Sequence, residues 1–359
     1  MNAATRIRPQ TLRVCRAGSA QSLAARSFTT STPLRNGAEE SKRIAAQAAD
    51  QLLADHSDRT VVRKQLIDAN QLAKLAFTLG RPTVSGVEVT DDTVLPEGTP
   101  VPAGYHLVYF TPGGVESQLG PDGTDRTYNA PAPFSNRMWA GGQMKWDLPE
   151  SDKSGLLVGD IAEEHTRLLS AKPKVSSTTG KPMVLVEVEK QLFSPRGLVL
   201  VDRRSWIFRP PTEVSDEKKL PAFQHFNEPS TQEDMTDKAG TVRRFVWSPV
   251  ALFRFSALTF NGHKIHYNEH WTHTRESHKG LVVHGPLNLI NMLNFWQDAH
   301  GTALNQSPRS IRYRAVNPIY AGEEYLARTI GKVGGEDGQP IWKLGMVKNG
   351  KDCMLADVQ

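Results

Sequence analysis

The chain has 359 residues, 38% of them hydrophobic, a length that allows two compact units with cores of their own. The formal net charge of +5 comes from five arginines in residues 1–28, where no acidic residue occurs, so the composition argues against a basic nucleic-acid-binding surface on the remaining chain. The longest apolar stretch, 245–260, contains Pro249 and Arg254 and is too interrupted to form a transmembrane helix or a stable membrane insertion.

The N-terminal segment, residues 1–40, is rich in Arg, Ser and Ala and has its first acidic residue at Glu39. This composition is typical of a mitochondrial transit peptide, and the sequence from Arg26 to Ser31 is similar to a matrix-processing site. Of the two cysteines, Cys15 falls in this segment, which leaves Cys353 without an internal disulfide partner, as expected in a reducing compartment. We therefore expect a transit peptide and disordered tail at 1–40, and localisation in the mitochondrial matrix.

The first half of the chain is expected to begin with helices and to continue with antiparallel strands. Apolar residues at helical spacing predict one helix over 41–55 and a second from Val61 to Leu79, which Gly80 ends. Beyond this helix, runs of apolar and alternating side chains predict strands. Their ranges are 106–110, 144–148, 156–169, 183–193 and 198–208. These elements predict a first unit over 57–210.

The second half is expected to form another unit of the same kind. Residues 211–239 are polar and proline-rich, and we interpret them as a linker. The unit over 240–359 opens with a strand at 242–247 and a short helix at 249–258, and its clearest helix covers 286–300. The closing strands are expected at 310–316, 324–330, 340–347 and 352–358. Helices followed by antiparallel strands in each half indicate the α+β class, with a helix packed on a curved sheet.

The densest group of reactive side chains lies in two segments, FSALTFNGHKIH at 255–266 and GLVVHGPL at 280–287. These segments resemble the MaoC-like, or type 2 enoyl-CoA hydratase, family of hot-dog proteins. They are most similar to the mitochondrial type 2 hydroxyacyl-thioester dehydratases and the mesaconyl-CoA hydratases. Segments 136–142, 202–209 and 317–323 resemble other landmarks of that family. The resemblance implies a double hot-dog fold with a degenerate first unit and a catalytic second unit.

The resemblance also implies roles for particular residues: Asn261 and His266 as the catalytic pair, and His284 and Gly285 at a helix start that binds the thioester carbonyl. Dehydrating a 3-hydroxyacyl thioester requires a base at C2, an acid for the C3 hydroxyl and donors for the charge on the thioester oxygen. The imidazole of His266 titrates near neutral pH and can serve as base or acid. Backbone N–H groups at a helix start favour an anion, and because Pro286 has no N–H, Gly285 is the natural donor.

Asn261 stands where many members of the broader family carry Asp. An amide does not exchange a proton at neutral pH, although it can hydrogen-bond the substrate hydroxyl or orient water. His266 is therefore expected to do more of the chemistry. The alternative for Asn261-Gly262 is an ordinary polar turn, for which this dipeptide is common.

Four further side chains are candidates for substrate binding: His263, Arg137, Trp139 and Arg275. The arginines can contact the phosphates of the carrier, although a solvent-exposed charge is the simpler explanation for them. The tryptophan can line an acyl tunnel, although core packing is the simpler explanation for it. His266 and His270 have the i, i+4 spacing of metal ligands on a helix, yet Asn261-Gly262 interrupts the approach to such a helix. We expect neither a metal nor another cofactor.

These observations predict an enzyme, a hydro-lyase that converts (3R)-3-hydroxyacyl thioesters to trans-2-enoyl thioesters in mitochondrial type II fatty acid synthesis. The carrier is expected to be acyl carrier protein or coenzyme A, no nucleic acid is expected as a partner, and a homodimer is left open. Three alternatives stay open: a hydratase of a short dicarboxylyl-CoA such as mesaconyl-CoA, which needs an arginine at the far end of the pocket; a non-catalytic acyl-thioester binding protein; and a metal-dependent hydrolase.

Overall fold

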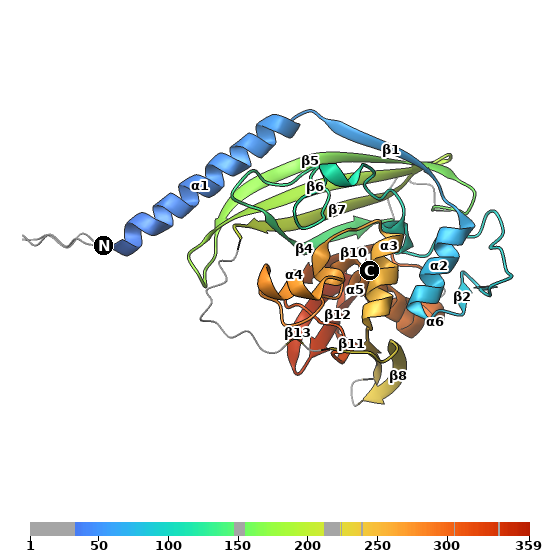
Figure 1. Cartoon of the computed structure of the whole chain (residues 1–359). Helices are drawn as coiled ribbons and strands as arrows, with labels where there is room; N and C mark the ends of the chain where they lie inside the picture. The colour runs from blue at the N-terminus through green and yellow to red at the C-terminus, as the bar shows by residue number, and fades with distance from the viewer. Residues whose placement is uncertain are drawn as a thin grey trace, which may run out of the picture.

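A computed structural model describes residues 33–146, 155–211, 223, 225–237, 240–304, 306–336 and 338–359. Most of the expected transit peptide, residues 1–32, lies outside the described residues. The described chain forms one large antiparallel sheet with a few helices, most of them gathered beside the second half of the sheet (Figure 1). This arrangement is of the α+β class. None of the described helices is long and apolar enough to cross a membrane.

The large sheet is built from eleven strands. Those of the first half are β1 (Thr60–Leu66), β4 (Asn136–Lys145), β5 (Ile161–Val175), β6 (Pro182–Ser194) and β7 (Gly197–Arg209). Those of the second half are β8 (Thr231–Asp237), β9 (Gly240–Val246), β10 (Ser310–Ala315), β11 (Tyr325–Gly334), β12 (Pro340–Lys348) and β13 (Lys351–Val358). Their order in the sheet is β1-β5-β6-β7-β4-β10-β13-β12-β11-β9-β8, and a separate hairpin pairs β2 (Thr83–Val84) with β3 (Val87–Glu88).

The two halves of the sheet meet where β4 pairs with β10. A Cβ atom at Gly142 would lie 2.2 Å from the Arg203 carbonyl oxygen and 2.7 Å from the Tyr313 hydroxyl oxygen, so only glycine permits this close packing. The junction places the start of β4, with Arg137 and Trp139, beside the helices of the second half. The unit boundaries expected at 57–210 and 240–359 stay a prediction, although strands from these two ranges occupy opposite halves of the sheet.

Helix α5 (Gly285–Trp296) is the central helix of the second half, and every residue from Leu287 to Trp296 is buried. Helix α3 (Pro249–Leu258) precedes the histidine-rich segment, and the Ser248 side chain caps it by accepting from the Ala251 N–H. The remaining helices are α1 (Pro33–His56), α2 (Ala69–Leu79), α4 (Glu269–Thr274) and α6 (Thr302–Leu304). The largest hydrophobic cluster joins α2, α3 and α5 to the sheet, whereas α1 packs on β5 and β6 in a cluster of its own.

Several predictions for the first half need correction. The predicted helix from Val61 begins only at Ala69, because residues 60–66 form strand β1, whose burial alternates residue by residue. The predicted strand at 106–110 is wrong: Tyr105–Val108 form a 3₁₀ turn whose four residues are all buried. A short run that is apolar on every side does not reveal its secondary structure through periodicity.

Other boundaries shift without a change of element type. The predicted strand at 144–148 contributes only its first residues to β4, and the strand predicted from 156 begins at Ile161. The helices predicted at 41–55 and 249–258 are confirmed within α1 and α3. The helix predicted over 286–300 is confirmed as α5, which continues into a π-helical turn, Gln297–Gly301.

The segment 211–239, expected as a linker, contributes strand β8 to the edge of the sheet. Its polar sequence concealed the strand, because β8 pairs with β9 partly through ion pairs. Asp234 contacts Arg243, and Glu233 contacts Arg244. Charged side chains are common on edge strands, where they suppress pairing with other chains.

Candidate active site

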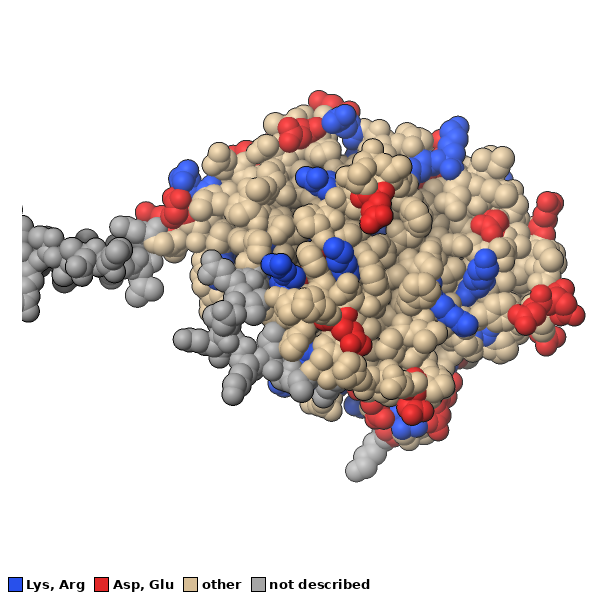
Figure 2. Space-filling view, in the orientation of Figure 1, with Lys and Arg blue, Asp and Glu red and all other residues tan. Residues whose placement is uncertain are grey.

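A cavity of about 670 Å³ lies between the first half of the sheet and the helices of the second half. Its walls bring together five of the residues singled out by the sequence: Asn261, His263, His266, His284 and Gly285. These residues come from the loop after α3 and from the start of α5. The face of the protein in Figure 2 carries basic and acidic side chains interspersed among uncharged residues.

His266 lies at the end of a 3₁₀ turn, Lys264–His266, and is 6% exposed. Its Nδ1 is 2.7 Å from the Val282 carbonyl oxygen, so this nitrogen carries the hydrogen and donates. The opposite nitrogen, Nε2, is then left with a free lone pair. Burial, followed by the neighbouring His284 and His263, lowers the pKa of His266 well below 6.5. The ring is therefore neutral at physiological pH and suited to accept a proton.

His284 is fully buried and stands immediately before α5. Its Nε2 is 2.9 Å from the Ser256 hydroxyl oxygen, and burial, followed by the charge of His263, lowers its pKa to about 3. Gly285 is the first residue of α5, where a backbone N–H has no acceptor within the helix. A Cβ at Gly285 would lie 3.1 Å from Cγ of Trp139, so the absence of a side chain lets Trp139 pack against the helix start.

Asn261 lines the same cavity beside the two histidines. Its side-chain oxygen accepts from the backbone N–H of His263 at 3.1 Å, and this bond orients the amide. The amide nitrogen is then the part of Asn261 available to a ligand. His263 is 6% exposed, and its ring packs edge-on to that of His266 with the centroids 5.4 Å apart.

Of the three predicted substrate-binding residues outside this loop, two line the cavity and one does not. Arg137 donates to the Asp125 backbone carbonyl oxygen at 3.1 Å, and its guanidinium lies over the Trp206 ring at 5.7 Å. Within the described residues Arg137 has no carboxylate partner, and burial lowers its pKa. Trp139 packs between Gly285 and the Arg204 guanidinium. Arg275 is exposed at the end of α4, outside the cavity.

The wall of the cavity formed by the first half of the sheet carries charged side chains. Lys190 Nζ is 2.8 Å from Glu164 Oε1, and Arg63 Nη1 is 3.3 Å from the same oxygen. Arg204 pairs with the fully buried Asp202 at 2.6 Å. Burial alone would raise the pKa of Asp202, but the Arg204 charge lowers it to about 2. Sequence reasoning did not identify this group, because Arg63, Glu164 and Lys190 lie on three different strands that only the pairing of the sheet brings together.

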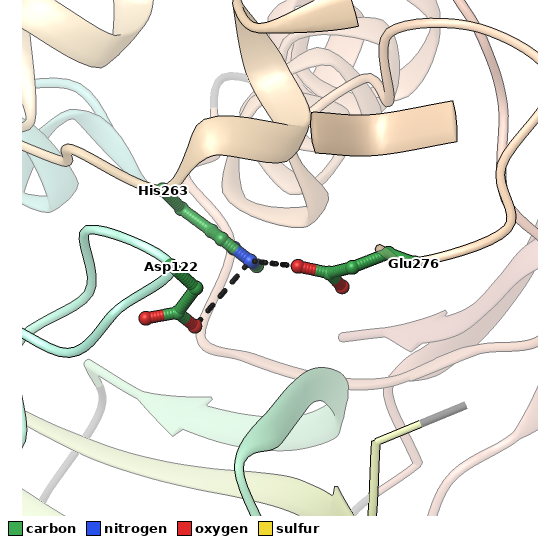
Figure 3. Close-up of side chains that lie close together, drawn as sticks. All are labelled: Asp122, His263 and Glu276. Carbon is green, nitrogen blue, oxygen red and sulfur yellow. Dashed lines mark hydrogen bonds and ion pairs between the residues drawn. The ribbon is translucent and has the colours of Figure 1, made fainter. Parts of the chain in front are cut away.

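One group of side chains in the described residues has the composition and closeness of a metal site: Asp122, His263 and Glu276, whose ligand-type atoms lie within 4.8 Å of one another (Figure 3). Neither carboxylate was expected there. Asp122 comes from the loop before β4 and is separated in sequence from His263 by more than a hundred residues. The pair considered in the sequence is not brought together, because His270 is exposed on α4 while His266 is buried.

Comparisons with known proteins identify the family of the chain. The family model for hydroxyacyl-thioester dehydratase type 2 matches residues 104–321, more than half of the chain. Mesaconyl-C(4)-CoA hydratase of Chloroflexus aurantiacus is 32% identical over 191 residues, which cover 53% of this chain and 61%, less than two thirds, of the hydratase. The mitochondrial hydroxyacyl-thioester dehydratase type 2 of Schizosaccharomyces pombe is 24% identical over 273 residues, 73% of this chain and 87% of that protein.

Solved structures show the same architecture. A MaoC-like dehydratase superimposes with a TM-score of 0.58 at 13% identity, covering 86% of this chain and 98% of its own. The MaoC-like dehydratase from Phytophthora capsici superimposes with a TM-score of 0.52 at 18% identity. This match covers 86% of this chain and 97% of that chain. The predicted double hot-dog architecture is thereby confirmed. From the matched family model, the chain belongs to the hydroxyacyl-thioester dehydratase type 2 family, a family of hydro-lyases.

Proposed function

We propose that the chain interconverts (3R)-3-hydroxyacyl thioesters and trans-2-enoyl thioesters by removing or adding water. The observation that carries this proposal is the neutral His266, whose free nitrogen lies in the same cavity as the start of α5. A base and a group of backbone donors are thus available to one bound thioester. This is the combination that elimination next to a carbonyl requires.

In the dehydration direction, His266 Nε2 takes a proton from C2 of the substrate. The electron pair left on C2 forms the C2–C3 double bond as the hydroxyl group leaves C3, and the hydroxyl becomes water with a proton delivered by His266 or by a water molecule. During this step negative charge develops on the thioester oxygen, where the Gly285 N–H and the helix dipole stabilise it. One such donor contributes about 3–4 kcal/mol in comparable sites. In this proposal the Asn261 amide nitrogen hydrogen-bonds the leaving hydroxyl.

We further propose a mitochondrial matrix location and a role in type II fatty acid synthesis. Support comes from the acid-free, arginine-rich residues 1–28 and from the mitochondrial dehydratase among the relatives. The acyl group would be carried on acyl carrier protein or coenzyme A. A homodimer is part of the same proposal. Light scattering of the purified protein measures whether two chains assemble.

The direct test is hydration of trans-2-enoyl thioesters of increasing chain length by the purified full chain, compared with the His266→Ala variant. Loss of general base catalysis is expected to lower kcat by about 10²–10⁴-fold. An exposed histidine changed in the same way, His270→Ala, is the matched control and should retain full activity. Equal rates for His266→Ala and the wild type would reject His266 as the base, and no turnover by the wild type would leave only a non-catalytic thioester-binding role.

A second candidate substrate is a short dicarboxylyl-CoA, favoured by the charged wall of the cavity. A long aliphatic chain would displace water from Arg63, Glu164 and Lys190 without replacing its hydrogen bonds, which costs free energy. A substrate carboxylate, in contrast, would supply the partner that Arg137 lacks among the described residues. Arginine binds carboxylates through two parallel hydrogen bonds. The relative named mesaconyl-C(4)-CoA hydratase is in keeping with this candidate.

The two candidates are separated by assaying crotonyl-CoA, a long 3-hydroxyacyl thioester and mesaconyl-CoA side by side. If the carboxylate binds Arg137, the Arg137→Met variant should raise KM for mesaconyl-CoA by at least about tenfold and leave KM for crotonyl-CoA unchanged. Arg312→Met, which removes an exposed arginine on β10, is the control. Higher kcat/KM for the long acyl chain than for mesaconyl-CoA would exclude the second candidate.

A further inference from the structure

Phe260 has a backbone conformation that a bulky residue rarely adopts. Its φ is 47°, in the left-handed region where the Cβ atom of an L-residue lies too close to a carbonyl oxygen. Among the described residues, six residues other than glycine have a positive φ. Four of them are Asp, Ser or Asn, whose short polar side chains can hydrogen-bond locally. The two bulky ones, Phe110 and Phe260, both line the cavity.

The end of helix α3 explains the conformation of Phe260 but not the choice of side chain. The Phe260 N–H donates to the Ala257 carbonyl oxygen at 3.2 Å, and the Asn261 N–H donates to the Ser256 carbonyl oxygen at 2.9 Å. These two hydrogen bonds form a common helix ending in which glycine takes the left-handed position. Glycine would make the same hydrogen bonds without the steric cost, so the helix end does not require a phenylalanine.

Burial does not offset the strained conformation of Phe260. Phe110 is 3% exposed and is enclosed by the core, whereas Phe260 is 66% exposed. A ring that reaches water lacks most of the apolar burial that stabilises a phenylalanine in a folded protein. Strained backbone conformations cluster at binding sites, where they place a side chain for a ligand. The Phe260 ring thus has the features of a group whose packing is completed by a ligand.

Phe260 is one of three exposed Phe and Tyr residues that line the cavity. The others are Phe253 on α3, which is 62% exposed, and Tyr267, which is 44% exposed. Along the chain, Phe260 directly precedes Asn261 and Tyr267 directly follows His266. Because His266 is only 6% exposed, the lining of the cavity changes from aromatic rings that reach solvent to an enclosed imidazole.

The chemistry of a thioester substrate determines what passes such an opening. When the reacting carbons lie beside His266, the pantetheine arm of the carrier must extend from the enclosed site to solvent. This arm is a flexible chain of apolar carbons and amide groups that carries charge only at its phosphate end. Aromatic rings bind a chain of this kind through dispersion and apolar burial, without a charged partner.

We infer that Phe260 is a substrate-binding residue whose ring packs against the pantetheine arm of the bound thioester. The inference rests on the proposed dehydratase reaction and assigns the route by which the arm leaves the cavity. Because coenzyme A and acyl carrier protein present the same arm, the contact serves either carrier. The left-handed backbone fixes the ring next to Asn261, so holding the arm helps to place the substrate hydroxyl at the Asn261 amide.

A second group of exposed apolar residues marks a competing route for the arm. Met138 is 37% exposed and Val316 is 44% exposed, and both line the cavity. Neither has a positive φ, and neither adjoins Asn261 or His266 in the sequence. The strained backbone and the position beside the site therefore favour the route over Phe260.

The test compares thioesters that share one acyl group and differ in the arm, with the full-length protein. The substrates are crotonyl-CoA, crotonyl-pantetheine and the crotonyl thioester of N-acetylcysteamine, which lacks most of the arm. Phe260→Gly should raise KM for the first two about tenfold and leave kcat and the KM of the truncated thioester unchanged. Phe260→Tyr keeps the ring and should keep the wild-type KM. An equal loss with all three substrates would show that the substitution displaces the site itself, and would overturn the inference.

The carrier and the competing route are tested with the same variants. Crotonyl-acyl carrier protein should show the same loss in Phe260→Gly as crotonyl-CoA. A loss confined to one carrier would place the contact with the nucleotide or with the carrier protein and would exclude the arm. Phe77→Ala, which removes a ring that is 40% exposed on α2, is the control and should leave every KM unchanged. An arm-dependent loss in Val316→Ala, without one in Phe260→Gly, would overturn the assigned route.

Two further measurements do not depend on turnover. Phe260→Gly should unfold at a urea concentration no lower than the wild type, because relief of the backbone strain offsets the lost ring contacts. A clearly lower midpoint would show that the ring stabilises the free protein and would overturn the inference. Calorimetric titration with butyryl-CoA, a saturated thioester that cannot be hydrated, should give a Kd about tenfold higher for Phe260→Gly. If the wild type hydrates no thioester, the proposed function fails, while this titration still decides the contact, since equal Kd values would reject it.

Discussion

The rings of His266 and His284 lie face to face, with centroids 3.5 Å apart and planes only 16° from parallel. The stack joins the loop after α3 to the residue immediately before α5. Because two positive charges at this separation would repel each other strongly, the stack permits at most one protonated ring. Burial lowers the pKa of both rings, and the neighbouring His284 lowers that of His266 further, so the proposed base stays unprotonated next to the helix start where the thioester oxygen is expected.

The first prediction concerns the acidic side of the activity profile. His266 acts as a base only when neutral, and its pKa lies well below 6.5 because of burial and the neighbouring histidines. We expect kcat/KM to stay constant as pH falls through 6.5, where an ordinary histidine would be half protonated. Steady-state rates measured in overlapping buffers from about pH 8 to about pH 5 check this. A twofold loss centred near pH 6.5 would contradict it.

The second prediction is that the folded state loses stability on mild acidification. In the folded protein burial lowers the pKa of both His266 and His284, the latter to about 3, whereas both regain ordinary values on unfolding. Below pH 6.5 the unfolded chain binds more protons than the folded one, so the free energy of unfolding falls as pH falls. The slope is at most about 1.4 kcal/mol per pH unit for each such histidine.

Urea unfolding at about pH 7 and about pH 5 measures this dependence of the unfolding free energy on pH. Both pH values lie above the pKa values of most carboxylates, so the histidines dominate the change. Buried His106, whose pKa burial also lowers, adds to the effect in the same direction. The variant His270→Gln removes an exposed histidine and should leave the slope unchanged. A free energy of unfolding that is equal at the two pH values would show that the folded protein takes up as many protons as the unfolded chain, which contradicts the lowered pKa values.

The third prediction concerns the start of α5. In Gly285→Ala the new Cβ would lie 3.1 Å from Cγ of Trp139, so the tryptophan or the helix start must move. Because the backbone N–H of this residue is the proposed donor to the thioester oxygen, kcat should fall by up to about 10²-fold. The control is Gly37→Ala, at an exposed position with no heavy atom within 4 Å. Circular dichroism identifies any general loss of structure, and full activity of Gly285→Ala would reject the proposed donor.

The fourth prediction tests the buried ion pair on the cavity wall. Lys190→Met leaves Glu164, whose side chain is 3% exposed, without its closest cation. Removing one partner of such a pair is expected to cost about 3–5 kcal/mol of unfolding free energy. The double variant Lys190→Met with Glu164→Leu should recover most of that loss, because the buried carboxylate is gone and the remaining cation, Arg63, is 22% exposed and reaches water. Urea denaturation of the three proteins measures both values, and a single variant as stable as wild type would mean that water reaches Glu164.

Part of the fold could be predicted because it depends on local signals. Ser248 followed by Pro249 fixes the start of α3, and the apolar residues of 287–296 identify a helix that is buried on every side. The polar edge strand β8 and the 3₁₀ turn at Tyr105–Val108 were not predictable, because their conformation depends on pairing and burial rather than on periodicity. Local sequence also placed His266, Asn261 and Gly285 close together along the chain.

By itself, then, the sequence determined which residues are candidates for the chemistry and that a helix begins directly after His284. Only the tertiary structure decided which of their nitrogens are free and which charges surround them. Asp122 reaches His263 through contact between two loops that are distant in the chain, whereas Glu276 reaches it from the segment after α4. The physical reason is that hydrogen-bond direction and burial set the protonation of a histidine, and both depend on neighbours that no local pattern encodes.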